Sequence, residues 1–544
     1  MSRLRRVEQN RVVEYVLTSE KKYADPFNDV EVSVEFTDPD GEKKVTPAFW
    51  SGSSKWRFRY SSHKTGEHVF RTRCSDASNG KLHNKTGRVE VVEYRGKNPL
   101  FKHGSLKVAE DRRHLEHADG KPFLWLGDTW WMGFAKRLRW PGEFKKLVRD
   151  RVRKGFTVIQ IVAGLYPDMA PFDPRGVNEG GFPWEKDYTR INPRYFDFAD
   201  RRIEWLVLSG LVPCIVGSWG YYMEFAGEEV IKKHWRNLVA RYYAYPVVWC
   251  LAGEATMPYY LSEAWTGVKR EEYVKKTRAA WTRVAKHVRS IDPRHNPVTI
   301  HPTDCARNMV DDASVIDIDM LQTGHNDVFS FENTIRSAVG SLAREPLMPV
   351  LVGEVTYEGI LGASWENVQR LMFWASILNG TMGHTYGANG IWQVNTEKKP
   401  FGPSPHGRSW GNIAWSKAYR LPGSTQVGLG KRFLEKYRWW EFEPHPEWVE
   451  PHWSEEDFYE PYAAGIPGEV RIIYIPWHGK ALWSGFKIKE VEPGVTYKAF
   501  YFDPRSGVEH DAVDVEPDVN LEWKPPLPET LEDWVLVLEK HGSR

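Results

Sequence analysis

The central part of the chain, from about residue 98 to about residue 430, alternates short apolar runs with longer segments of helical periodicity. Apolar runs of four to eight residues are typical of strands buried on both faces of a parallel sheet. Eight such strand–helix units in about three hundred residues predict a (β/α)8 or TIM barrel. The predicted strands are 123–127, 157–162, 212–216, 246–252, 297–301, 315–319, 348–353 and 381–386.

The two ends of the chain carry strand patterns without helices between them. In residues 1–97, apolar and polar residues alternate at 30–36, 56–60, 67–73 and 88–92, and turn residues separate these runs. In residues 431–544, strand-like runs occur at 469–475, 496–502 and 534–538. Both patterns predict β-sandwiches. We therefore expect an α/β protein of three domains: an N-terminal β-sandwich (1–97), a catalytic barrel (98–430) and a C-terminal β-sandwich (431–544).

The charge balance of the chain argues against two classes of partner. Lys and Arg number 74 and Asp and Glu number 72, so the net charge is only +2. Such a chain has no overall field to attract nucleic acid or an anionic membrane, and we expect neither partner. No segment has the length of a membrane span or the pattern of a signal peptide, which predicts a cytoplasmic protein. It could form a homo-oligomer.

Two glutamates stand where a barrel places its chemistry. Glu254 and Glu354 each follow a glycine at the end of predicted strands four and seven. The carboxyl ends of barrel strands surround the active site, and a pair of carboxylates there is suited to hydrolysing a glycosidic bond. The sequence therefore predicts a glycosidase. Spacing along the chain does not distinguish a retaining pair, about 5–5.5 Å apart, from an inverting pair, about 6.5–9.5 Å apart.

The same rim is expected to carry polar and aromatic side chains that bind the hydroxyls and faces of sugar rings. Asp128 could instead cap the turn that follows it, and His384 could be a core residue. The predicted substrate-binding residues are Asp128, Trp130, Trp131, Tyr166, Trp219, His301, Gln322, His325, His384 and Tyr386.

Several alternatives stay open at this point. Glu358 could replace Glu354 as the nucleophile. The barrel could bind carbohydrate without cutting it, or it could use His301, His325 and His384 to hold a metal for hydrolysis. No HxH or HExxH spacing occurs, and the four cysteines include no CxxC pair, so we expect neither a metal nor another cofactor.

Three motifs in the barrel resemble one family. LKVAEDRRHLEHADGKPFLWLGDTWW at 106–131 and the Gly-Glu pairs at 253–254 and 353–354 resemble the apiosidase-like TIM-barrel glycoside hydrolases. DPFNDVEVSVEF near the N-terminus resembles the β-sandwich that often precedes this barrel. FLEKYRWWEFEP and YFDPRSG resemble the β domain that often follows it, sometimes described as collagen-binding. The resemblance thus covers nearly the whole chain.

This resemblance implies a retaining hydrolase acting on a small oligosaccharide or glycoside, with Glu254 as acid/base and Glu354 as nucleophile. The larger clan of similar plan usually has Asn before the strand-four acid, where it binds the sugar 2-hydroxyl. Gly253 stands there in this chain, so Asp128, His301 or Gln322 would have to supply that contact. Apiosidases often have Asp as the strand-four acid, so Glu254 argues against apiose as the sugar.

Overall fold

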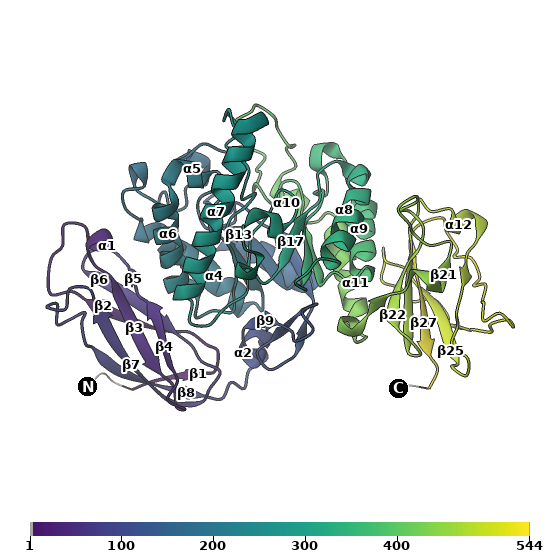
Figure 1. Cartoon of the computed structure of the whole chain (residues 1–544), viewed down its shortest axis with the longest axis horizontal. Helices are drawn as coiled ribbons and strands as arrows, with labels where there is room; N and C mark the ends of the chain where they lie inside the picture. The colour runs from purple at the N-terminus through teal and green to yellow at the C-terminus, as the bar shows by residue number, and fades with distance from the viewer. Residues whose placement is uncertain (1–3, 543–544) are drawn as a thin grey trace.

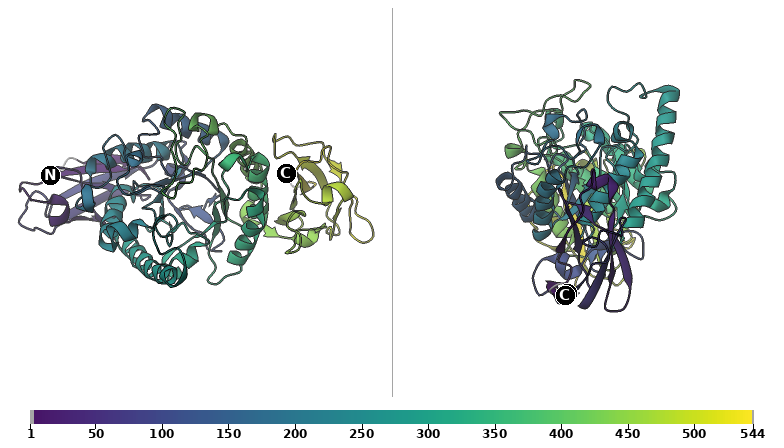
Figure 2. Two further views of the ribbon diagram at one scale, coloured as in Figure 1. Left: turned by 90° about the horizontal axis from the view of Figure 1, so that it is seen from above. Right: turned by 90° about the vertical axis from the view of Figure 1, so that its left-hand side faces the viewer.

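The computed structural model describes residues 4–542 and has the three-part plan expected from the sequence. The barrel lies in the middle, with the N-terminal and C-terminal β regions at its opposite sides (Figures 1 and 2). The outermost residues of the two predicted outer domains, 1–3 and 543–544, lie outside the described residues.

The barrel is built from eight parallel strands in the order β16-β15-β14-β13-β12-β19-β18-β17, which confirms the predicted fold class. The two ends of this order are linked by the backbone N–H of Asp317, two residues before β17, which donates to the carbonyl of Val298 in β16 at 2.7 Å. The strands are β12 (Trp125–Thr129), β13 (Val158–Val162), β14 (Val212–Val216), β15 (Val248–Cys250), β16 (Val298–Thr299), β17 (Asp319–Gln322), β18 (Val350–Glu354) and β19 (Gly383–Tyr386).

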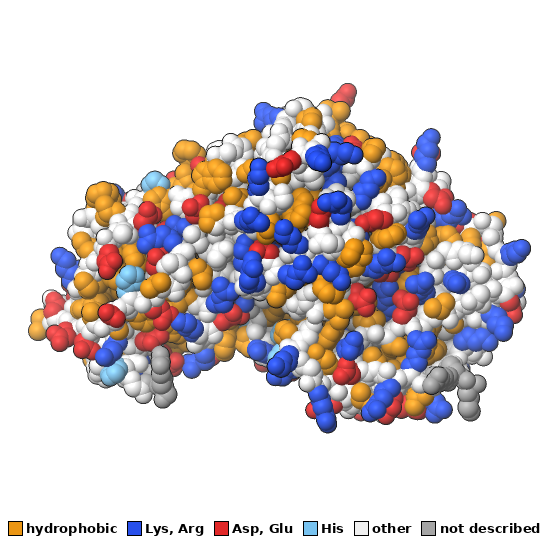
Figure 3. Space-filling view, turned by 180° about the vertical axis from the view of Figure 1, so that it is seen from behind, with side chains coloured by type: hydrophobic (Ala, Val, Ile, Leu, Met, Phe, Trp, Pro, Cys, Tyr) orange, Lys and Arg blue, Asp and Glu red, His pale blue; other side chains and the backbone are white. Residues whose placement is uncertain are grey.

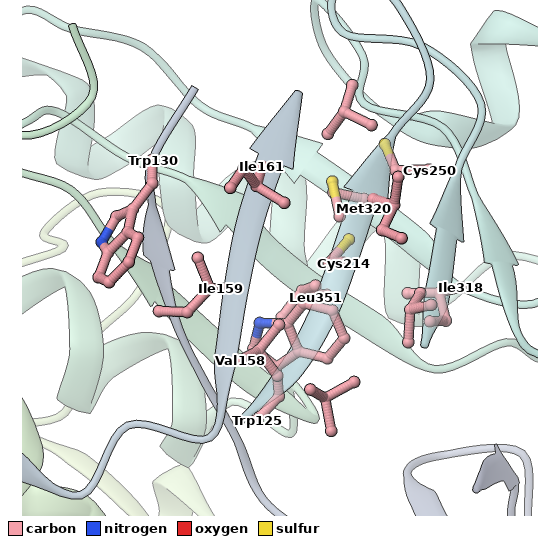
Figure 4. Packing of buried hydrophobic residues seen from close by; sticks show 14 of the residues in the cluster. Trp125, Trp130, Val158, Ile159, Ile161, Cys214, Cys250, Ile318, Met320 and Leu351 are labelled. Atoms are coloured by element: carbon pink, nitrogen blue, oxygen red, sulfur yellow. The ribbon is translucent and has the colours of Figure 1, made fainter. Parts of the chain in front are cut away.

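Successive side chains of a strand point to opposite faces, so alternate positions fill the barrel and the others face the helices. Cys214, Cys250, Met320 and Leu351 gather between the strands in Figure 4, and all are fully buried. The surrounding helices are α3 (Gly142–Lys154), α4 (Pro193–Leu208), α5 (Tyr222–Ala226), α6 (Glu228–Tyr242), α7 (Gly267–Ile291), α8 (Phe331–Leu342), α9 (Glu366–Leu378), α10 (Trp415–Ala418) and α11 (Gly423–Leu434).

Helix α3 shows how the outer layer forms. Its Phe144, Leu147 and Val148 lie on one face and are buried, as the apolar spacing predicted. Trp130 packs edge-on against Phe144, with 5.7 Å between ring centroids. Gly155 ends the helix at φ 91°, a conformation that suits a residue without Cβ.

The sixth strand differs from its predicted position. The sequence favoured 315–319, but the structure has a 3-10 turn at Ala313–Val315 and begins β17 at Asp319. The apolar residues Ile316 and Ile318 are buried in irregular backbone that leads into the strand. Burial alone therefore produced the strand-like pattern, and Gln322 is the last residue of β17.

The N-terminal region is a sandwich of a five-stranded and a three-stranded sheet. Tyr15 and Phe58 of the smaller sheet pack on Phe70 of the larger one, with ring centroids 5.1 Å or less apart. Its elements are β1 (Arg5–Glu8), β2 (Val13–Thr18), α1 (Pro26–Asp29), β3 (Val32–Thr37), β4 (Lys43–Pro47), β5 (Phe49–Trp50), β6 (Lys55–Tyr60), β7 (Gly66–Cys74) and β8 (Thr86–Val92). Helix α2 (Pro99–His103) and the small sheet β9 (Leu106–Val108), β10 (Leu115–His117) and β11 (Pro122–Phe123) lead into the barrel.

The C-terminal region packs one face of a six-stranded sheet onto helices α9 and α11. Trp374 stacks on Tyr474 at 6.1 Å and Phe433 stacks on Phe502 at 4.2 Å. The six-stranded sheet comprises β20 (Glu443–Pro444), β22 (Tyr462–Ile466), β23 (Val470–Ile475), β27 (Trp534–Lys540), β25 (Tyr497–Phe502) and β26 (Val513–Asp514). A second apolar cluster on its other face includes residues of β21 (Val449–Glu450), α12 (Ala481–Ser484) and β24 (Lys487–Ile488).

A buried ion pair crosses the same contact. Nη2 of Arg370 in α9 lies 2.5 Å from Oδ1 of Asp533, and both side chains are almost completely buried.

On the outside of the molecule, Lys and Arg side chains gather over the middle of the face in Figure 3, with Asp and Glu among them. Within residues 4–542, no helix combines the length and apolarity needed to cross a membrane.

Candidate active site

Glu254 and Glu354 lie together at the mouth of the barrel. Nε2 of Gln322 donates to Oε1 of Glu254 at 3.1 Å and to Oε1 of Glu354 at 3.3 Å. Glu254 follows β15 and Glu354 ends β18, so strands four and seven deliver the two carboxylates to one place. The bridging amide comes from the end of strand six.

A β-bulge turns Glu354 toward this pair. Leu321 pairs with Val352 and Gln322 pairs with Glu354, so Gly353 is an extra residue in β18. A Cβ on Gly353 would lie 2.3 Å from Cγ of Met320, which places position 353 on the inner face. Strict alternation would then send Glu354 outward to the helices. The extra residue restores the inward direction, a known effect of bulges beside active sites.

Glycine at position 253 has a steric reason. A Cβ there would lie 2.2 Å from the ring of Trp219, much closer than atoms can pack. Nε1 of Trp219 donates to Oε2 of Glu254 at 3.0 Å, so the ring that occupies this space also holds the carboxylate. Glu254 itself has φ 43°, an uncommon conformation for a residue with a side chain and one that is found at functional sites.

Two histidines surround the Glu354 carboxylate. Nε2 of His301 lies 3.1 Å from Oε2, and Nε2 of His325 lies 2.9 Å from Oε1. Tyr357 stacks on His325 at 4.9 Å and accepts a 3.0 Å hydrogen bond from Nε1 of Trp131. These contacts fix the orientation of a carboxylate that is only 4% exposed.

The surroundings shift the two carboxyl groups in opposite directions. Burial and the nearby charge of Glu354 raise the pKa of Glu254. Burial also opposes the charge of Glu354, but His301 and His325 outweigh it and lower the pKa of Glu354 to about 2. Although burial disfavours its charged form, Glu354 raises the pKa of His325. The site therefore favours a protonated Glu254 beside an ionised Glu354.

Five of the ten predicted binding residues lie around the pair. Gln322, His301, His325 and Trp219 contact a carboxylate directly, and the Trp131 ring packs edge-on against His301 at 5.3 Å. Buried polar atoms beside the pair have no protein partner among the described residues and are suited to bind hydroxyls. They are Nδ1 of His301, Nδ1 of His325 and Oε1 of Gln322.

The other five predicted residues are not brought to the pair by any described contact. Asp128 is fully buried, accepts from Nε of Arg151 at 2.5 Å and also accepts from Trp130. The hydroxyl of Tyr166 meets that of Tyr195 in α4 at 2.6 Å. His384 packs edge-on against Phe373 of α9 at 5.7 Å, and Tyr386 donates to Glu358.

The alternation of side chains explains most of these placements. Asp128, His384 and Tyr386 occupy strand positions whose side chains face the helices, while their neighbours Gly127 and Thr385 face inward. The position of a residue near a strand end is therefore not sufficient to place it at the mouth. A count of residues within each strand would have separated the two groups.

Glu358, the alternative nucleophile, lies elsewhere. Its carboxylate accepts from the hydroxyl of Tyr386 and, at 3.0 Å, from the backbone N–H of Gly423 at the start of α11. Burial raises the pKa of Glu358 to about 7. These contacts join strand eight to α11 and involve neither Glu254 nor Gln322.

Sequence reasoning missed several residues near the pair. Tyr357 follows the Glu354 strand by three positions, and Trp392 stacks on it at 6.0 Å. Asp168 is buried, and its charge contributes to the raised pKa of His325. The length of the loop after strand eight was the available signal, because long loops in compact domains often carry function.

The three histidines of the metal-dependent alternative do not converge. His301 and His325 both direct Nε2 at Glu354, whereas His384 lies against the helix layer. Across residues 4–542, the structure contains no group of three or more His, Cys, Asp or Glu side chains arranged to hold a metal ion.

Comparison with known proteins matches two parts of the chain. The family model described as "Apiosidase-like, catalytic domain" matches residues 109–441, and a domain of unknown function, DUF5060, matches residues 6–75. The family resemblance seen in the barrel motifs is thereby confirmed. No curated protein matches the chain.

Solved structures share the fold. A structure described as a glycoside hydrolase is 21% identical, with a TM-score of 0.67, and the match covers 83% of this chain and 100% of that one. A glycoside hydrolase family 5 protein from Bacteroides vulgatus is 22% identical, with a TM-score of 0.65, and the match covers 82% of this chain and 95% of that one. At this identity the similarity shows the fold alone.

Proposed function

The chain belongs to the apiosidase-like catalytic-domain family of glycosidases, and we propose that it is a retaining enzyme in which Glu254 is the acid/base and Glu354 the nucleophile. The substrate is a small oligosaccharide or glycoside. The observation that carries this proposal is the single nitrogen of Gln322 that bonds both carboxylates.

That shared nitrogen supports retention through its geometry. An amide directs its two N–H bonds about 120° apart, and two straight hydrogen bonds of the observed 3.1 and 3.3 Å would set the accepting oxygens about 5.5 Å apart. A retaining pair needs about 5–5.5 Å, whereas an inverting pair needs about 6.5–9.5 Å to accommodate its water.

In the first step the ionised Glu354 attacks the anomeric carbon and Glu254 gives its proton to the departing oxygen. The opposite pKa shifts support these roles, because a nucleophile must be ionised and an acid protonated at the same pH. The Trp219 N–H holds the carboxyl of Glu254 in place while it acts.

In the second step Glu254, now ionised, takes a proton from water, and the water oxygen bonds to the anomeric carbon as the bond from that carbon to Glu354 breaks. The sugar leaves with its original anomeric configuration, and both carboxyl groups return to their starting states. With glycine at 253, the supported partners for the 2-hydroxyl are His301 and Gln322, since Asp128 bonds Arg151.

The test is hydrolysis of a panel of nitrophenyl glycosides, pentofuranosides included, by wild type and Glu354→Gln. We expect wild type to release nitrophenol from at least one member, and the variant to be slower by about 10³-fold or more with an unchanged thermal midpoint. Proton NMR of the first product should show the substrate's anomeric configuration. Inverted product would reject the assigned mechanism, and equal activity of the variant would reject Glu354 as nucleophile.

A further inference from the structure

A long connection at the same mouth follows strand eight. Residues 387–414, between β19 and α10, are all described and contain no helix or strand. We call residues 395–414 the strap; part of it is the green loop near the top of Figure 1. Its two ends meet, because the backbone N–H of Trp415 donates to the carbonyl of Asn395 at 2.8 Å.

One buried carboxylate fastens the strap to the loop after strand two. Oδ1 of Asp168 accepts hydrogen bonds from the hydroxyl of Ser404 and, at 3.3 Å, from Nε1 of Trp410. Asp168 is only 8% exposed and has φ 55°, so the surrounding structure holds it in an uncommon conformation. Nε1 of Trp410 also donates to Oγ of Ser404 at 3.1 Å, so the three side chains bond one another. We call Asp168, Ser404 and Trp410 the clasp.

A second attachment lies beside this clasp. Arg175 donates to the carbonyls of Phe401 and Pro403 at 3.1 and 3.2 Å and packs its guanidinium on the Phe401 ring at 4.7 Å. The same arginine donates to the carbonyl of Asp168 at 3.2 Å. The strap is thus held to the strand-two loop by its backbone and by three of its side chains, those of Phe401, Ser404 and Trp410.

The strap also reaches the loop after strand four. Tyr260 of that loop accepts a 3.1 Å hydrogen bond from the backbone N–H of Asp168, and its ring packs edge-on against His406 at 5.3 Å. A segment rooted at strand eight therefore passes to loops of strands two and four. It bridges that side of the mouth.

The root of the strap contacts the carboxylate site. Trp392, just before the strap, stacks on Tyr357, and Tyr357 stacks on His325, a partner of Glu354. The His325 side chain is 25% exposed, whereas His301 is fully buried. Of the two histidines that bond Glu354, His325 of the strand-six loop is therefore the one open to solvent.

We propose that the strap, fastened by Asp168, closes one side of the mouth so that the enzyme removes only the terminal sugar of a chain. An enzyme that cuts inside a chain needs the chain to pass across its carboxylates in both directions, and the bridged loops oppose this. Asp168 is then a specificity-determining residue that acts through the strap. This inference rests on the proposed glycosidase function.

The clasp is tested without substrate by trypsin cleavage after Arg408, an exposed residue at the tip of the strap. Asp168→Ala removes the acceptor, whereas Asp168→Asn keeps a carbonyl oxygen for Ser404 and Trp410 and is the matched control. We expect cleavage to be at least about tenfold faster in Asp168→Ala and nearly unchanged in Asp168→Asn, since cleavage follows the population of opened strap. Equal rates in Asp168→Ala and wild type would overturn the clasp. Ser404→Ala, which removes one donor, should give an intermediate rate and covers the case in which Asp168→Ala does not fold.

Specificity is tested on end-labelled neutral oligosaccharides of the sugar that the nitrophenyl panel identifies. Wild type and Asp168→Asn should shorten the chain by one sugar at a time, and Asp168→Ala should release internal fragments as well. Internal fragments from wild type at the earliest time points would overturn this inference alone. If wild type cleaves no glycoside at all, the proposed function fails and the inference with it, while the trypsin result still reports on the clasp.

Discussion

Glu254 and Glu354 are joined through a single atom, Nε2 of Gln322, which lies 3.1 Å from an oxygen of the first and 3.3 Å from an oxygen of the second. Gln322 thereby links the two carboxyl groups and holds them at one separation. The histidines bond only Glu354, which makes the pair asymmetric. As a result, the pKa of Glu354 is lowered while that of Glu254 is raised.

Glu254→Gln should slow the hydrolysis of natural glycosides by about 10²–10⁴-fold, because the departing oxygen no longer receives a proton. Dinitrophenyl glycosides need little protonation, so their first step should be nearly as fast as in wild type. The measurement is kcat/KM for a series of leaving groups of increasing pKa. A loss that is the same for every leaving group would contradict the acid role.

The activity of the wild-type enzyme should be highest between the pKa of Glu354 and the raised pKa of Glu254. The active form has Glu354 ionised, and the pKa of Glu354 is about 2, so activity should fall only at very low pH. It also needs Glu254 protonated, and activity should decline as pH rises through the raised pKa of Glu254. A kcat/KM profile from pH 3 to 9 checks this, and the alkaline decline should be absent in Glu254→Gln.

His301→Phe should move the acid limb of that profile upward. The phenyl ring keeps the packing against Trp131, but the bond from Nε2 to Glu354 is lost. The pKa of Glu354 then rises, so less of it is ionised at pH 3–4 and kcat/KM falls there more than at pH 6. An unchanged acid limb would show that His301 does not set this pKa.

Gly253→Ala should cost about 1–3 kcal/mol of stability and displace the Trp219 ring, because the new Cβ would overlap it. Glu254 would lose its indole partner, so activity should fall as well. Gly340→Ala is the matched control: it lies exposed in α8 with open space around it, and alanine there should stabilise the helix by about 0.5–1 kcal/mol. Urea unfolding followed by tryptophan fluorescence separates the two outcomes.

Asp533→Ala should lower the free energy of unfolding by about 3–5 kcal/mol, because it leaves Arg370 charged, buried and without its carboxylate. The double variant Arg370→Met with Asp533→Leu should recover most of this loss. Arg336 and Glu455 form an exposed ion pair between α8 and the C-terminal region, and Glu455→Ala should cost less than about 1 kcal/mol. Comparable losses in the two single variants would contradict the importance of burial.

The barrel could be predicted from the sequence, because the two kinds of element have different patterns of apolar residues. Strands buried on both faces are continuous apolar runs, whereas helices buried on one face have apolar residues every three or four positions. It was also sufficient to propose both glutamates, since each ends an apolar run. It failed at Asp128 and His384 because being near a strand end does not tell which way a side chain points. Gln322 was expected to bind substrate, but its link between the carboxylates depends on where β17 ends, and the apolar residues 315–318 hid that boundary.

The bulge in β18 lets two successive residues, Gly353 and Glu354, face the inside of the barrel. Deleting Gly353 would place Glu354 directly after Val352, at a position that also faces inward and lies opposite Gln322, so the carboxylate would keep its direction. Insertions and deletions of one residue are usually thought harmless in loops and harmful in cores. Here the bulge accommodates one extra residue inside a core strand, so this strand could differ in length by one residue and still direct its carboxylate to the mouth of the barrel.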